Sequence, residues 1–168
     1  MTEALMRADE ALNLRLAADG DAQDLFGLLA LCFAEYPGCF VDPHDDLPDL
    51  LAPGSSFDRK GGAFWVVEDE RGRICACVAV DFPEAGAAEL HRLYVRPDQR
   101  GKGLGASLVR KVERHARERG AQRIFFWSDT RFTNAHRLYQ RLGYVRVPGQ
   151  RDLGDISNSV EYRFEKDL

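Results

Sequence analysis

The glycine loop, residues 96–105 (R-P-D-Q-R-G-K-G-L-G), constrains the fold more than any other part of the 168-residue sequence. It lies between a run typical of a strand, residues 89–95 (ELHRLYV), and residues 104–116, whose apolar spacing predicts one face of a helix. Glycines allow positive φ and close approach of the backbone to a ligand. Successive N–H groups at a helix N-terminus bind anions, helped by the helix dipole. The segment therefore predicts a strand–loop–helix unit that holds a phosphate or pyrophosphate.

The glycine loop matches neither of the common nucleotide-binding motifs. The dinucleotide fingerprint G-x-G-x-x-G fails from Gly101, because its sixth position is Ala106, and it also fails from Gly103. A P-loop requires Ser or Thr after Gly-Lys, where this chain has Gly103. An ordinary glycine-rich turn is the alternative to an anion site. We expect the anion site, with Arg100 and Lys102 as nearby cations.

Hydrophobic periodicity in the rest of the chain predicts strands and helices in mixed order. Strands are expected at residues 12–17, 63–68, 74–81, 89–95, 124–127, 144–147 and 160–164. Helices are expected at residues 25–33, 104–116 and 135–142, with a short helix near 46–51 in an irregular stretch over 36–62. This order predicts an α/β (α+β) fold, with a helix-covered sheet that is mostly antiparallel in its first half. The length predicts a single domain over residues 1–168.

Composition and charge argue against a membrane-spanning, a secreted or a nucleic-acid-binding protein. The chain has 45% hydrophobic and 30% charged residues, and it lacks both a membrane-spanning apolar run and a signal-peptide pattern. A net charge of −4 argues against a nucleic-acid partner. The four cysteines are expected to be reduced thiols in a cytoplasmic protein. Cys75 and Cys77, two apart, are expected on one face of a strand, and no spacing predicts a metal site.

Two motifs together resemble a known family. Arg100, Gly103 and Gly105 match R/Q-x-x-G-x-G/A after a strand end of the form Leu-x-Val-x-Pro. Residues 138–144 then match L-Y-x-x-x-G-F/Y. Over residues 89–147 the chain resembles the general-control-related (GNAT) N-acetyltransferase superfamily. The resemblance implies a central mixed, mostly antiparallel sheet of six to seven strands, flanked by about four helices.

The resemblance also implies acetyl-CoA as the co-substrate and no metal. The backbone of Leu93, Tyr94 and Val95 would pair with the pantetheine arm as an added strand does. Asn134 is a further implied CoA contact, although the superfamily often has its asparagine at the position of Phe132. The backbone N–H groups implied to hold the pyrophosphate belong to Arg100, Gly101, Lys102, Gly103, Leu104, Gly105 and Ala106.

The implied reaction is acetyl transfer to an amine by direct attack in a ternary complex. Glu89 matches the position of a glutamate base in some members, and Tyr139 matches the family tyrosine that protonates the leaving thiolate. A backbone N–H in residues 93–95 would stabilise the oxyanion. Each assignment has an alternative from the residues alone: Tyr139 fits a packed apolar stripe, Glu89 fits an ion pair, and His91 or His136 could be the base.

The acceptor side is less constrained by the sequence. The acidic segment 42–49 favours a cationic amine, unless it is only a solvated loop, and Phe33, Tyr36 and Phe40 are expected as apolar walls. The acceptor is expected to be a small-molecule, peptide or protein amine, with no nucleic acid and no membrane as partner, and a homodimer stays open. The alternative function is a catalytically silent CoA-sensing or interaction module on the same scaffold.

Overall fold

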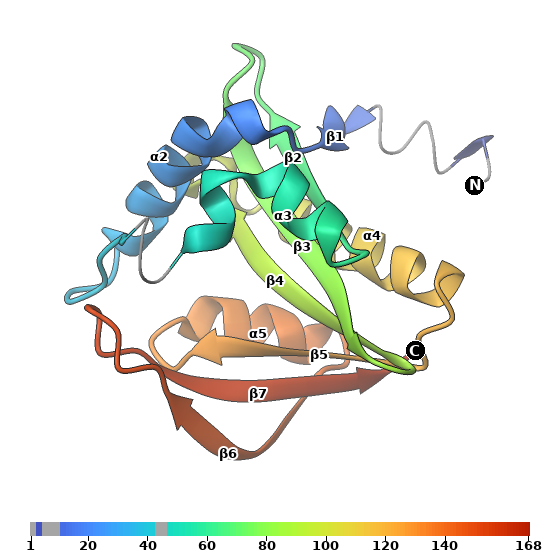
Figure 1. Ribbon diagram of the computed structural model, residues 1–168. Coiled ribbons are helices and arrows are strands. Elements are labelled where there is room, and N and C mark those ends of the chain that lie inside the picture. The colour runs from blue at the N-terminus through green and yellow to red at the C-terminus, as the bar shows by residue number, and fades with distance from the viewer. Residues whose placement is uncertain (1–2, 5–10, 43–46) are drawn as a thin grey trace.

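The computed structural model describes residues 3–4, 11–42 and 47–168. Seven strands form one sheet in the order β1-β2-β3-β4-β5-β7-β6 (Figure 1). The strands are β1 Leu14–Leu16, β2 Ala63–Glu68, β3 Ile74–Glu84, β4 Ala87–Val95, β5 Arg123–Asp129, β6 Val145–Asp152 and β7 Val160–Asp167. The α-helices are α2 Ala22–Phe33, α3 Pro53–Arg59, α4 Leu104–Glu118 and α5 Thr133–Arg141. Short 3-10 turns are η1 Asp19–Asp21, η2 Pro48–Leu51 and η3 Pro97–Gln99.

All strand pairs are antiparallel except β4 and β5, which run parallel. This sheet, with α2 to α5 around it, confirms the predicted fold class. In the described part of the chain, no helix is long and apolar enough to cross a membrane.

The helices cover the sheet as two apolar layers. In one layer, α2 and α3 bury Leu25, Leu29 and Phe57 against β2 and β3. In the other layer, α4 buries Leu108 and Val112 against β3 and β4. The predicted apolar stripe of α4 is therefore confirmed as its core face.

The parallel pairing of β4 and β5 is short. It joins Ala87 to Arg123, Ala88 to Ile124 and Glu89 to Phe125, and no pairing follows. Figure 1 shows the two ribbons diverging beyond this point. The second half of β4 therefore has a strand neighbour only on its β3 side.

A β-bulge interrupts β4 where it leaves β5. Cys77 pairs with Tyr94 and Ala79 pairs with His91, so two residues of β4 oppose one residue of β3. The first of the two, Arg92, has φ +55°, which is unusual for a residue with a side chain. The thiol of Cys77 donates to the Arg92 carbonyl at 3.1 Å. The bulge redirects the backbone of β4 beside the divergence.

Helix α3 was not predicted, because Pro53 and Gly54 are typical turn residues. In the structure Pro53 opens the helix, where its missing N–H costs nothing. A Cβ on Gly54 would lie 2.7 Å from the carbonyl oxygen of Ala17. The glycine therefore allows close packing of α3 beside the end of β1.

The prediction that Cys75 and Cys77 share a face is wrong. Val67 pairs with Ala76 and Glu68 with Ile74, so Cys75 is an extra residue in β3. Cys75 lies in the α4 layer and Cys77 in the α2 layer. Both thiols are buried and free, as expected of core cysteines.

Candidate active site

The glycine loop ends in a helix start that no side chain caps. Gly103 is the N-cap of α4, no side-chain hydrogen bond caps the helix, and its first turn contains no acidic residue. Gly101 and Gly103 both have φ +78°, and a Cβ at either position would meet nothing within 4 Å. The first N–H groups of an α-helix have no acceptor within the helix. The loop therefore presents backbone donors next to open space, which suits an anionic group.

Gly105, the last glycine of the loop, is required for a different physical reason, which is helix packing. A Cβ there would lie 3.1 Å from Cδ2 of Leu138 on α5. The residue must be small so that α5 can pack against the start of α4. One of the three motif positions therefore serves helix packing rather than approach to a ligand.

The Arg100 side chain attaches the loop to the rest of the protein. Its Nε donates to the Val95 carbonyl at 2.9 Å, and its Nη1 donates to Glu35 at 2.7 Å. A third contact, 3.7 Å long, reaches the Cys32 sulfur. The Arg100 guanidinium is therefore held by β4 and the end of α2, and its role as a nearby phosphate cation stays a prediction. Lys102 stays exposed on the loop, with Nζ 3.3 Å from Oε1 of Gln99.

The segment Leu93, Tyr94 and Val95 lies on the edge of β4 that β5 leaves unpaired. Burial raises the pKa of Tyr94 well above its usual value. An added extended chain could pair along this edge. The strand edge predicted to pair with a ligand is therefore followed directly in the chain by the glycine loop.

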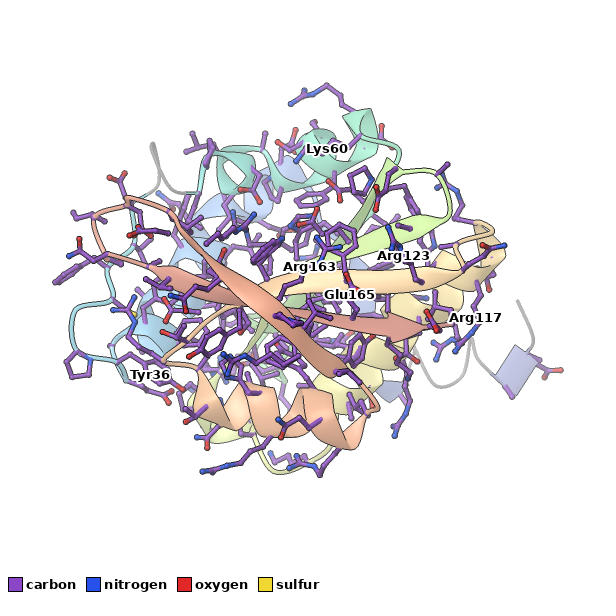
Figure 2. All side chains as sticks on the ribbon, turned by 90° about the horizontal axis from the view of Figure 1, so that it is seen from below. Tyr36, Lys60, Arg117, Arg123, Arg163 and Glu165 are labelled. Atoms are coloured by element: carbon purple, nitrogen blue, oxygen red, sulfur yellow. The ribbon has the colours of Figure 1, made fainter. Side chains whose placement is uncertain are left out.

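Aromatic side chains surround the end of this strand. The ring of Phe33 lies 5.7 Å from Tyr94 and 6.1 Å from Phe132, and Tyr36 lies 4.9 Å from Phe132. Figure 2 shows Tyr36 near the first turn of α5. The predicted wall residues Phe33 and Tyr36 therefore form one cluster with Tyr94 and Phe132. Phe40 lies apart, with 56% of its surface exposed.

Glu89 belongs to a cluster of titratable groups. Asp81 is its cross-strand partner, and His91 follows two residues later on β4. The His91 Nε2 atom lies 2.9 Å from Oδ1 of Asp81 and 3.6 Å from Oε2 of Glu89. Burial raises the pKa of Glu89, while the charge of His91 lowers it and that of Asp81 raises it further. A carboxylate with a raised pKa is suited to act as a base near neutral pH.

Tyr139 lies on α5, in the apolar layer that also contains α4, and not in the layer of α2 and α3. Only 5% of it is exposed, and its ring packs 4.4 Å from Phe126 and 5.5 Å from Phe164. Burial raises the pKa of Tyr139 far above its usual value, and a hydrogen bond with Ser128 lowers it by less. Its hydroxyl therefore keeps its proton at neutral pH. Tyr139 can therefore pack in the core and also act as a general acid that protonates the leaving thiolate.

The two histidines considered as bases differ in position. His91 is part of the Glu89 cluster. His136 lies on α5, where its Nε2 is 3.1 Å from Oγ of Ser128 and burial lowers its pKa. Asn134, in the first turn of α5, accepts a hydrogen bond from Arg137 at 3.2 Å and is exposed.

An ion pair that the sequence did not predict holds the bulge. Nε and Nη2 of Arg92 donate to the two carboxylate oxygens of Asp49 at 3.0 and 2.7 Å. Burial alone would raise the pKa of Asp49, but the hydrogen bonds and charge of Arg92 outweigh it and lower this pKa. In the acidic segment 42–49, Asp49 is therefore a partner of β4, and residues 43–46 lie outside the described residues. The two partners are 43 positions apart, so no local pattern could have identified them.

Comparisons with known proteins agree with this geometry. The model of the acetyltransferase (GNAT) family matches residues 24–144. An uncharacterized N-acetyltransferase of Schizosaccharomyces pombe is 33% identical over 135 residues, covering 79% of this chain and 83% of that protein. The chain belongs to the GNAT acetyltransferase family.

Solved structures show the same fold at low identity. A GNAT-family acetyltransferase from Staphylococcus aureus superposes with a TM-score of 0.79 at 18% identity, covering 93% of this chain and 98% of that one. The PaiA N-acetyltransferase of Thermoplasma acidophilum, solved in complex with coenzyme A, has a TM-score of 0.71 at 16% identity, with 92% and 98% covered. The family and the fold are thus established together.

Proposed function

We propose that the chain transfers an acetyl group from acetyl-CoA to a primary amine of a small molecule, peptide or protein, by direct attack in a ternary complex. The observation that carries the proposal is the uncapped, glycine-lined start of α4 directly after the unpaired edge of β4. A pyrophosphate is bound by free backbone N–H groups such as those at the start of α4. A pantetheine arm contains amides and can pair with an unpaired strand edge such as that of β4. The CoA-bound relative of the same fold supports this assignment.

In this proposal the backbone of residues 100–106 holds the pyrophosphate, and Leu93 to Val95 pair with the pantetheine arm. Acetyl-CoA supplies an activated thioester. The glycines keep side chains out of the space beside the loop. Lys102 and Asn134, both exposed, are the side chains best placed to add polar contacts at the two helix starts.

Glu89 removes the proton from the attacking amine, which has no lone pair while protonated. Its raised pKa follows from burial, and Nε2 of His91, the most exposed side chain of the Glu89 cluster, lies 3.6 Å from its Oε2. The N–H groups beside the Arg92 bulge stabilise the oxyanion, because the bulge turns the backbone next to the divergence. Tyr139 protonates the departing thiolate from the other layer.

The acceptor meets Asp81 and Glu89, which favour a cationic amine. We further propose that residues 1–168 form a single acetyltransferase domain. We also propose a cytoplasmic location, on the ground that four cysteines are too few for a disulfide scaffold in a chain of this length. A homodimer and the identity of the amine stay open to direct measurement.

The test is a thiol-release assay with acetyl-CoA and a panel of polyamines, amino acids, aminoglycosides and peptide amines. Release of free thiol that depends on any amine in the panel supports the proposal. Tight binding of CoA with no amine-dependent release across the panel would instead favour a catalytically silent CoA-binding module.

A further inference from the structure

We propose that Asp81, Glu89 and His91 form a binding site for a divalent transition-metal ion, best matched by Zn²⁺, and that the bound ion blocks the use of Glu89 as a base. Asp81 and Glu89 face each other across β3 and β4. His91 follows Glu89 at the two-residue spacing that keeps side chains on one face of a strand. Two adjacent strands therefore project three ligand side chains from one face of the sheet.

The distances between these side chains fit a single ion. One donor atom from each residue can be chosen so that all three lie within 4.8 Å of one another. Zinc bonds of about 2.0–2.1 Å place the ligand atoms of a tetrahedron roughly 3.3 Å apart. The observed distances from Nε2 of His91, 2.9 Å to Asp81 and 3.6 Å to Glu89, lie on either side of that value. Small side-chain rotations would suffice to admit the ion.

The donor set selects the class of metal. One imidazole nitrogen with two carboxylate oxygens suits zinc and its neighbours in the transition series, whereas Mg²⁺ and Ca²⁺ prefer oxygen ligands alone. Three protein ligands leave a fourth position for water, as in an open zinc site. We therefore expect Zn²⁺ and Co²⁺ to bind, and Mg²⁺ to bind far more weakly.

The surroundings hold the three ligands in place while leaving access. The side chains of Asp81, Glu89 and His91 are 13%, 17% and 27% exposed. The centroids of the Phe57 ring and the imidazole lie 5.7 Å apart in a T-shaped contact, which restricts rotation of the imidazole. Lys60 lies 4.0 Å from Asp81, and as its side chain is 49% exposed it can move into solvent when a cation enters. In the absence of metal, Lys60 offsets part of the negative charge.

Metal binding has a chemical consequence for the reaction. The ion occupies the Nε2 lone pair of His91 and one oxygen of each carboxylate. A Glu89 carboxylate bound to metal is a much weaker base. Loss of activity on metal binding rests on the proposed role of Glu89, whereas binding itself does not.

The test titrates the purified chain with Zn²⁺, measured by equilibrium dialysis, and with Co²⁺, measured by visible absorption. We expect one ion per chain, and at least ~100-fold weaker binding in His91→Asn and Asp81→Asn, since loss of an outer-shell partner alone costs 10–100-fold. The matched controls His115→Asn and Glu84→Gln lie outside the cluster and should bind like the wild type. Cys39→Ser excludes a site at the half-buried thiol.

Stoichiometric Zn²⁺ binding that His91→Asn leaves unchanged, or no binding at millimolar Zn²⁺, would overturn the site. Inhibition of thiol release by Zn²⁺ and recovery with EDTA are expected in the wild type and in the control variants, but not in His91→Asn or Asp81→Asn. Binding at the cluster without inhibition would leave the site intact and contradict Glu89 as the base, so the two claims fail separately.

Discussion

The glycine loop follows the end of β4, whereas the Glu89 cluster lies at the start of that strand, and the two regions rely on different parts of the chain, backbone and side chains. The loop offers backbone donors, and its glycines provide space and positive φ. The cluster offers side chains whose charge depends on pH and on neighbours across two strands. Substitutions in the loop should therefore act on cofactor affinity at every pH. Substitutions in the cluster should act on the rate in a way that changes with pH.

The largest effect is expected for Tyr139→Phe. It should lower kcat by about 10²–10⁴-fold, the range for a positioned general acid. CoA affinity should stay unchanged, because phenylalanine keeps the ring that packs against Phe126. Raising the pH should not restore the rate, since the proton is needed after attack. Steady-state kinetics and calorimetric titration with CoA measure both quantities, and a wild-type kcat in this variant would remove Tyr139 as the acid.

Gly103→Asp tests whether the backbone N–H groups of the glycine loop bind the cofactor. A carboxylate beside the pyrophosphate repels it by about 4 kcal/mol at 4 Å in a partly solvated site, so CoA affinity should fall by about 100-fold or more. The matched control is Gly72→Asp, because Gly72 also has positive φ and open space but lies in the β2–β3 turn. The control should show the same small loss of thermal stability and normal affinity. Equal affinity in the two variants would place the cofactor elsewhere.

Glu89→Gln tests whether the Glu89 side chain acts as the base. At pH 7 we expect turnover to fall by about 100-fold, and the defect should shrink as pH rises because more amine arrives deprotonated. In the wild type, kcat/KM should increase as Glu89 loses its proton, with an apparent pKa above the roughly 4.3 of a free glutamate. Glu165→Gln is the control: Glu165 pairs with Arg163 on β7 at 2.7 Å (Figure 2). A pH profile of Glu89→Gln identical to that of the wild type would exclude the base role.

The smallest rate effect, about tenfold in kcat with little change in KM, is expected for Asp49→Asn. The Arg92 guanidinium then loses its carboxylate, so the bulge is held less firmly. The lowered pKa of Asp49 contributes stability that is present above about pH 3.9 and lost as pH falls through the folded-state pKa. Acid unfolding of the variant should therefore depend less on pH. A variant that lost stability but kept full kcat would limit the pair to a structural role.

The two regions also differed in how far the sequence predicted them. The glycine loop, the strand before it and the stripe of α4 are consecutive, so local spacing was sufficient. Strand β2 was predicted with its observed bounds, 63–68. Asp81 and Asp49 approach β4 through strand register and a long-range ion pair, which no single-sequence pattern contains. The contact of Arg100 with Glu35, 65 positions away, was likewise outside the reach of a local pattern.

The most direct measurement is a crystal structure of the chain with acetyl-CoA. The predicted result has pyrophosphate oxygens accepting hydrogen bonds from the N–H groups of residues 100–106, and the pantetheine arm along Leu93 to Val95. The thioester sulfur would lie within hydrogen-bond reach of the Tyr139 hydroxyl, with Glu89 on the opposite side of the acetyl group. Acetyl-CoA bound away from the start of α4, or a sulfur out of reach of Tyr139, would contradict this arrangement.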